Sequence, residues 1–95
     1  MIDQVERIRQ MELCFLQLQQ VWVSAPERIR TDPVVRTYLQ ILQDYQACGL
    51  WLEDYTSDES GRLPADLQRG VLSQDGLYNL LQAIFEWESE SHENL

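Results

Sequence analysis

Acidic side chains gather just ahead of a glycine near the middle of this chain. Asp54, Asp58 and Glu59 precede Gly61, and carboxylate oxygens are ligands that Ca²⁺ prefers. An EF-hand loop that began at Asp54 would need a glycine at its sixth position and a glutamate at its twelfth, but Glu59 and Ala65 stand there. We therefore predict no metal site, and expect these acids to cap helices or lie solvated in a turn, with a loose cation site as the minor alternative.

Other residues that often do chemistry are few or badly spaced. His92 is the single histidine and lies near the C-terminus, and Cys14 and Cys48 do not form a Cys-x-x-Cys pair. Gly70 and Gly76 do not match a phosphate-binding loop, which would also need a lysine that this chain lacks. We predict no catalytic residue and no cofactor or metal site, and therefore no enzymatic activity.

Charge is unevenly distributed along the chain. It has 16 acidic residues against 7 arginines, a net charge of −9. Residues 1–48 hold five arginines and six acids, a net of −1, and residues 49–95 hold two arginines and ten acids, a net of −8. The second half would repel phosphates, so we expect no nucleic-acid partner, although Arg28, Arg30 and Arg36 can form a weak basic patch.

The hydropathy pattern of the sequence predicts the cellular compartment of the protein. No run of about eighteen apolar residues is present, and residues 1–10 have no apolar centre of the kind a signal peptide needs. We expect a cytoplasmic protein with no membrane partner. In an antiparallel helix hairpin the two cysteines would be offset by ~7 Å along the axis in addition to a helix spacing of ~8–10 Å, whereas a disulfide needs Cα atoms within ~7 Å, so both are expected to stay reduced.

The first half of the chain predicts two long helices. Apolar residues at alternating spacings of three and four indicate a helix over about 3–23. Ser24 with Glu27 fits a capping box for a short helix at 25–31, although a continuation of the first helix kinked at Pro26 stays open. Asp32 and Pro33 then predict a helix over 33–48 that ends at Gly49. The predicted seam of the first helix is Ile8, Met11, Phe15, Leu18 and Trp22.

The second half predicts shorter elements and one further long helix. We expect a helical turn at 50–55 with Trp51 or its neighbour Leu50 inward and Asp54 outward, a turn at 56–61, and another helical turn at 64–69. Ser73 is the expected cap of a helix over 74–87. Acids at 88–95 oppose the helix dipole, so this tail is expected to fray. The fold class is all-α: a small bundle of three main helices in a single domain, residues 1–87.

Residues 50–81 concentrate aromatic and charged side chains around turns. Arg69, with its five donors, is expected to hold loop carbonyls and a carboxylate in place, although Arg62, Arg69 and the acids around them can also be read as a recognition surface. Aromatic and apolar residues are the interface candidates, with core packing as their other use. The full candidate surface is Trp51, Asp54, Tyr55, Asp58, Leu63, Pro64, Asp66, Arg69, Asp75 and Tyr78.

The same segment also carries a family resemblance. Its pattern consists of Trp51-Leu52-Glu53-Asp54-Tyr55, Asp58-Glu59, Gly61, Leu63-Pro64, Asp66-Leu67, Arg69-Gly70-Val71-Leu72-Ser73 and Asp75-Gly76-Leu77-Tyr78. It resembles an uncharacterised bacterial family of small acidic proteins, the domain of unknown function family 4298, and residues 4–12 are similar too. The resemblance implies a helical, cytoplasmic, bacterial protein and brings no activity, ligand or catalytic residue.

Three functions stay open at this point. The first is a non-catalytic protein–protein interaction module that associates with itself, with its contact face in residues 50–81. The second is an acidic regulator or inhibitor that binds a basic surface of a partner protein. The third is a small-ligand-binding protein or enzyme, which would need a concave pocket with converging polar groups.

Overall fold

The computed structural model describes residues 3–73 and 75–93, with side chains up to residue 90. Every regular element in those residues is a helix, which confirms the all-α fold class. The prediction that the last helix starts at Gln74, the side chain of His92 and residues 94–95 of the predicted tail lie outside what is described. The elements are α1 (Gln4–Ser24), α2 (Arg28–Thr31), α3 (Pro33–Ala47), α4 (Leu50–Glu59), the 3₁₀ helix η1 (Gly70–Leu72) and α5 (Gly76–Glu93).

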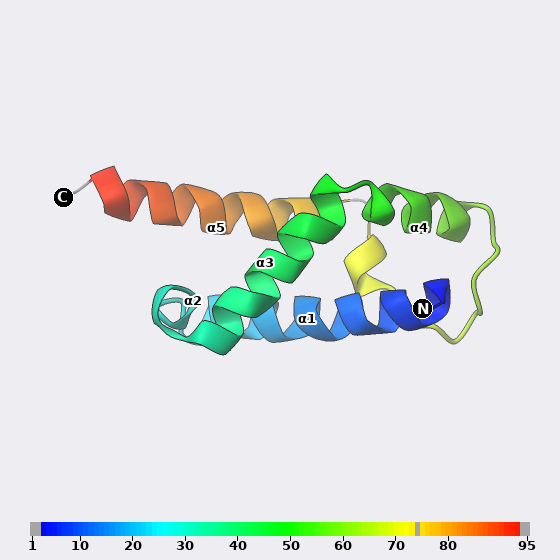
Figure 1. Cartoon of the computed structure of the whole chain (residues 1–95), viewed down its shortest axis with the longest axis horizontal. Coiled ribbons are helices and arrows are strands. Elements are labelled where there is room, and N and C mark those ends of the chain that lie inside the picture. Colours follow the sequence, from blue (N-terminus) through cyan, green and yellow to red (C-terminus); the bar gives the residue numbers. More distant parts are fainter. Residues whose placement is uncertain (1–2, 74, 94–95) are drawn as a thin grey trace.

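The helices form two rows with one helix crossing them. Figure 1 shows α4 and α5 end to end in one row, α1 in the other, and α3 running diagonally across both, with η1 between the rows. The molecule measures 48 × 24 × 20 Å, and its radius of gyration of 14.1 Å exceeds the ~12 Å typical of this length. An elongated shape of this kind leaves long helix faces without a neighbour.

α1 forms because its apolar seam packs on the rest of the chain and its first turn is capped. The Asp3 carboxylate accepts a hydrogen bond of 2.8 Å from the backbone N–H of Glu6. The seam is confirmed: Ile8, Phe15 and Leu18 are buried, and Met11 and Trp22 pack against that core.

α1 ends before Pro26 and α2 begins after it, so Pro26 separates two helices and does not kink a continuous one. The predicted capping box is wrong, because the Ser24 hydroxyl donates to the carbonyl of Gln20 and Glu27 makes no side-chain cap. The predicted helix at 25–31 is therefore shortened to α2.

α3 starts and stops as its sequence predicts. The Asp32 carboxylate accepts a 2.9 Å hydrogen bond from the N–H of Val34, and Pro33 occupies the first turn. Gly49 has a φ of 90°, the left-handed conformation expected of a glycine after a helix, and α4 begins directly after it. The buried face of α3 holds Val35, while Val34 is exposed.

The connection from α4 to α5 differs most from expectation. The helical segment predicted at 50–55 extends to Glu59, and the positive φ of 72° at Gly61 follows it. The predicted helical turn at 64–69 is reduced to a single turn, closed by a 3.2 Å hydrogen bond from the N–H of Leu67 to the carbonyl of Pro64, and the 3₁₀ helix follows at 70–72. A short isolated helix gains too few hydrogen bonds to offset its ordering cost, and here the Arg69 side chain binds the loop carbonyls instead.

α5 is longer than predicted because its far end is held by the first half of the chain. The Ser73 hydroxyl accepts a 3.2 Å hydrogen bond from the N–H of Gly76, so Ser73 acts at the helix start as expected. The helix continues to Glu93 and does not end at Trp87. Arg30 lies 3.9 Å over the Trp87 ring, and Arg36 pairs with Glu88 at 3.0 Å. These contacts outweigh the unfavourable placement of acids at a helix C-terminus.

Candidate functional site

Asp54 lies at the centre of the most connected polar cluster in the described residues. We expected it to point outward from α4, but its side chain is fully buried. Arg7 donates to both of its oxygens, and the bond from Nε to Oδ2 measures 3.0 Å. Gln4 donates to it at 2.9 Å and the hydroxyl of Tyr45 at 2.6 Å. One carboxylate thus joins α1, α3 and α4.

The cluster keeps Asp54 ionised although it is buried. Burial raises the pKa of its carboxyl, but the hydrogen bonds from Arg7, Tyr45 and Gln4 outweigh this and hold the pKa below its ordinary value. Burial and the bond to Asp54 raise the pKa of Tyr45 well above its ordinary value, so this tyrosine stays a donor. The bond to Asp54 also raises the pKa of Arg7. The cluster is a stable ion pair with every partner in place, and its chemistry is structural.

We expect the stability of the protein to fall in acid because of this carboxylate. Its pKa is lower in the folded chain than the ~3.9 of an unfolded Asp. The unfolded chain therefore binds the proton first, so the contribution of Asp54 is complete above that value and is lost as pH falls through the folded pKa. Urea unfolding at several pH values between 7 and 2 measures this. The stability gap between the wild type and Asp54→Asn should narrow in acid, and a gap that stays constant would contradict the expectation.

Arg69 makes the second polar cluster, at the loop between α4 and η1. Its guanidinium donates to the carbonyls of Leu67 and Pro64 and pairs with the carboxylate of Asp58. It thus holds two loop carbonyls and one carboxylate, as proposed from the sequence. The carboxylate comes from α4, and not from the acids nearer in the loop. Arg62, Asp66 and Asp75 are all exposed.

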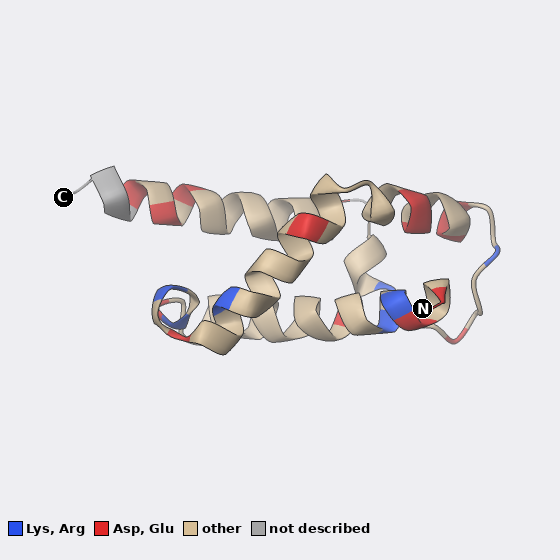
Figure 2. Cartoon of the chain, in the orientation of Figure 1, with Lys and Arg blue, Asp and Glu red and all other residues tan. Residues whose placement is uncertain are grey.

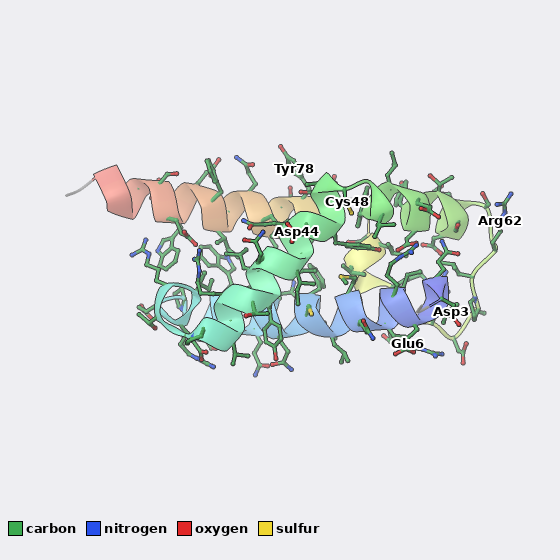
Figure 3. The ribbon with its side chains drawn as sticks, in the orientation of Figure 1. Asp3, Glu6, Asp44, Cys48, Arg62 and Tyr78 are labelled. Carbon is green, nitrogen blue, oxygen red and sulfur yellow. The ribbon has the colours of Figure 1, made fainter. Side chains whose placement is uncertain are left out.

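Arg69→Ala should loosen this loop. The variant leaves two carbonyls and the Asp58 carboxylate without their donor, but the Arg69 side chain is 35% exposed, so water replaces part of the loss. We expect a decrease of about 1–2 kcal/mol in the free energy of unfolding, measured by thermal melting. Arg62→Ala, an exposed arginine of the same loop (Figure 3), is the matched control and should melt like the wild type. Equal melting temperatures for the two variants would contradict the assigned role.

Glu12 is a buried acid that the sequence analysis missed. Its side chain is 6% exposed, and its Oε1 accepts a 2.7 Å hydrogen bond from the N–H of Val71 at the start of η1. A Cβ at Gly70 would lie 3.1 Å from Oε2, so a glycine there lets the carboxylate approach the backbone. The available signal was position, because Glu12 falls at helical spacing between the seam residues Ile8 and Phe15.

The aromatic candidates divide between packing and exposure. Trp51 donates its indole N–H to the carbonyl of Val71 at 2.9 Å and stacks on Tyr55 with ring centroids 5.0 Å apart. Leu63 is half-buried and Pro64 is exposed. Tyr78 is 58% exposed and points away from the body of the molecule (Figure 3). Of the aromatic candidates, Tyr78 on α5 is the one with most of its side chain on the surface.

A shallow groove lies between α1 and the loop that leads to η1. Its volume is about 310 Å³, its floor is mostly leucine, and Arg9 and Asp66 supply opposite charges at its edge. The residues that line it are Arg9, Glu12, Leu13, Leu16, Asp66, Leu67 and Gln68.

The remaining chemical candidates are accounted for within the described part of the chain. Cys14 and Cys48 are free thiols, as expected, and burial raises the pKa of Cys14. Among the side chains that the structure describes, no group of three His, Cys, Asp or Glu residues is placed to hold a metal ion. None of the helices in residues 3–73 and 75–93 combines the length and the apolar character needed to cross a membrane.

The basic patch anticipated from the sequence is engaged within the molecule. Arg28 pairs with Asp32 at 2.8 Å, Arg30 stacks on Trp87, and Arg36 pairs with Glu88. Each of the three arginines therefore already has a partner from this chain.

Fold and site together define the class: a small all-α domain whose buried polar groups bind its own helices. The family model described as Domain of unknown function (DUF4298) matches residues 8–91, from the first turns of α1 to the last of α5. The chain belongs to this family, as the pattern in residues 50–81 predicted. Comparison with curated proteins and with solved structures found no match.

Proposed function

We propose that this chain is a non-catalytic protein–protein interaction module of the bacterial cytoplasm that associates with copies of itself. The observation that carries the proposal is the exposure of large apolar side chains on the outer faces of α1 and α5. Leu13, Leu16 and Val23 share one face of α1, and apolar surface gathered in this way is covered by a partner in many small proteins, because exposing it to water is unfavourable. The side chains are Leu13 (63% exposed), Leu16 (46%), Val23 (79%), Tyr78 (58%) and Phe85 (64%).

The polar residues support a non-catalytic role. A catalytic acid or base must be free to meet a substrate. The Asp54 carboxylate instead receives hydrogen bonds on both oxygens from Arg7, Gln4 and Tyr45, and Glu12 is bound to the backbone of η1. Both acids are therefore engaged by other parts of the same chain.

Sedimentation velocity over a wide range of protein concentrations tests self-association. We expect the average mass to rise above that of the 11.2 kDa monomer as the concentration increases. Added salt should favour association, because it screens the repulsion between two chains of net charge −9. A mass that stays at the monomer value throughout would contradict the self-association part of the proposal.

An acidic regulator of a basic partner is the second candidate. Figure 2 shows acids along α4 and toward the end of α5, and residues 49–95 carry a net charge of −8. Poly-arginine is a suitable probe of this role, and salt separates the two candidates, since binding driven by acids weakens steeply as ionic strength rises. A small-ligand site is the third candidate, but its groove of about 310 Å³ is at the low end for ligand pockets.

A further inference from the structure

α1 carries a second seam on its surface, in addition to the seam that faces the core. Its members follow spacings of four and three in alternation, the pattern by which helices pair with one another. All five are exposed, and the exposed fractions of the three apolar ones lie between 46% and 79%. This outer seam is Arg9, Leu13, Leu16, Gln20 and Val23.

Charge identifies which partner suits the outer seam. The stretch from Leu13 to Pro26 contains no charged residue, and Figure 2 shows α1 without charge over this length. Two copies with a net charge of −9 repel each other over most of their surfaces. The uncharged stretch is where they can meet without bringing like charges together. A strongly basic partner would be attracted to the acids of α4 and α5, away from the seam.

We propose that two copies of this chain pair through the outer seam of α1, antiparallel about a two-fold axis. The proposal deepens the proposed function, on which it rests, by naming the contact face and its occupant. Leu13 of one copy packs against Leu16 of the other, and the groove beside these leucines receives the partner's side chains. A two-fold axis repeats each contact, as an isologous dimer requires.

The antiparallel direction follows from the ends of the seam. With Leu13 opposite the other copy's Leu16, Arg9 lies opposite its Gln20, whose side-chain carbonyl can accept from the guanidinium. A parallel pair in register would instead place the two Arg9 side chains together, which is unfavourable. In this register the facing pairs run from Arg9 to Gln20, ~17 Å of helix, and Val23 lies beyond them opposite the other copy's Glu6, so the interface is small and the dimer depends on concentration.

Sedimentation velocity of matched variants tests the contact face. Leu13→Lys/Leu16→Lys should weaken dimerisation by more than about tenfold, because four buried leucines are lost from the interface. The same substitutions lower the magnitude of the net charge, so general repulsion cannot explain the loss. Val34→Lys/Leu52→Lys makes the same change in charge at two exposed apolar positions outside α1 and α5 and should dimerise at least as well as the wild type. Circular dichroism checks that both variants are folded.

Gln20 tests the direction of pairing with a substitution that an exposed polar position tolerates. Gln20→Glu should strengthen the dimer about two- to tenfold, because two Arg9–Glu pairs form across the axis, although the net charge becomes more negative. Gln20→Lys should weaken it by a similar factor. The reverse order would overturn the antiparallel arrangement, and these variants decide the matter even if the leucine variant does not fold.

The outcomes separate this inference from the function on which it rests. If the leucine variant still dimerises as the wild type does, the contact face proposed here is wrong and self-association stands. If the wild type remains monomeric at every concentration, self-association itself fails, and the proposed pairing fails with it.

Discussion

Asp54→Ala should lower the free energy of unfolding by about 3–5 kcal/mol, the usual cost of removing one partner from a buried ion pair. The substitution leaves the Arg7 guanidinium, 17% exposed, without its counter-charge. It also leaves the buried Tyr45 hydroxyl and the Gln4 amide without their acceptor. A chain of this length has a total stability of only about 5–14 kcal/mol, so much of the protein would be unfolded at elevated temperature.

Urea denaturation followed by circular dichroism measures this loss. Glu53→Ala is the matched control, because Glu53 is the adjacent acid on α4 and is exposed. It removes the same charge and should change stability by less than about 0.5 kcal/mol. Tyr45→Phe should lie between the two, since it deletes one of the donors to Asp54 and keeps the buried ring. If the Asp54 and Glu53 variants were equally stable, the buried cluster would not be an important support of the fold.

Glu12→Ala should have the next largest effect, a loss of about 2–3 kcal/mol. The N–H of Val71 is buried and donates to this carboxylate, and hydrogen bonds to charged groups contribute about 1.5–3 kcal/mol. Truncation removes the acceptor and leaves a cavity between α1 and η1. The carbonyl of the same residue, Val71, accepts from Trp51, so the loss should spread to the contact between η1 and α4.

Amide hydrogen exchange at Val71 reports the Glu12 contact directly. Protection of this N–H should fall sharply in Glu12→Ala and be largely kept in Glu12→Gln, whose side-chain oxygen can still accept. Glu6→Ala is the control, since Glu6 is an exposed acid on the same helix. Unchanged protection at Val71 in the alanine variant would show that the bond does not hold η1 in place.

The helices whose ends are set by capping residues in the sequence could be predicted. Asp32, Pro33 and Gly49 act through their own backbone or that of near neighbours, so the bounds of α3 can be read directly from the chain. The prediction for residues 64–69 failed in part because the conformation of this segment depends on a residue outside it. Arg69 binds carbonyls that precede it and a carboxylate from α4.

The site was harder to predict because its pairs join residues far apart in sequence. We expected Asp54 to be exposed because acids are usually solvated. Its donor Arg7 lies on α1, 47 residues earlier in the chain. A charged residue at a core-facing position of a helix can indicate a buried polar contact, and Glu12 occupies such a position. The extension of α5 escaped prediction for the same reason, since it depends on Arg30 and Arg36 from the first half.

Two groups of charged contacts join helices that are far apart along the chain. At one end Asp54 ties α1, α3 and α4 together, and at the other Arg36 and Arg30 hold the last turns of α5. The first tie joins α1, α3 and α4, and the second joins α2 and α3 to α5, so α3 is the helix that the two ends share. Protonation of Asp54 in acid weakens the first tie, so the end of the molecule that holds α4 should open before the cooperative loss of the whole.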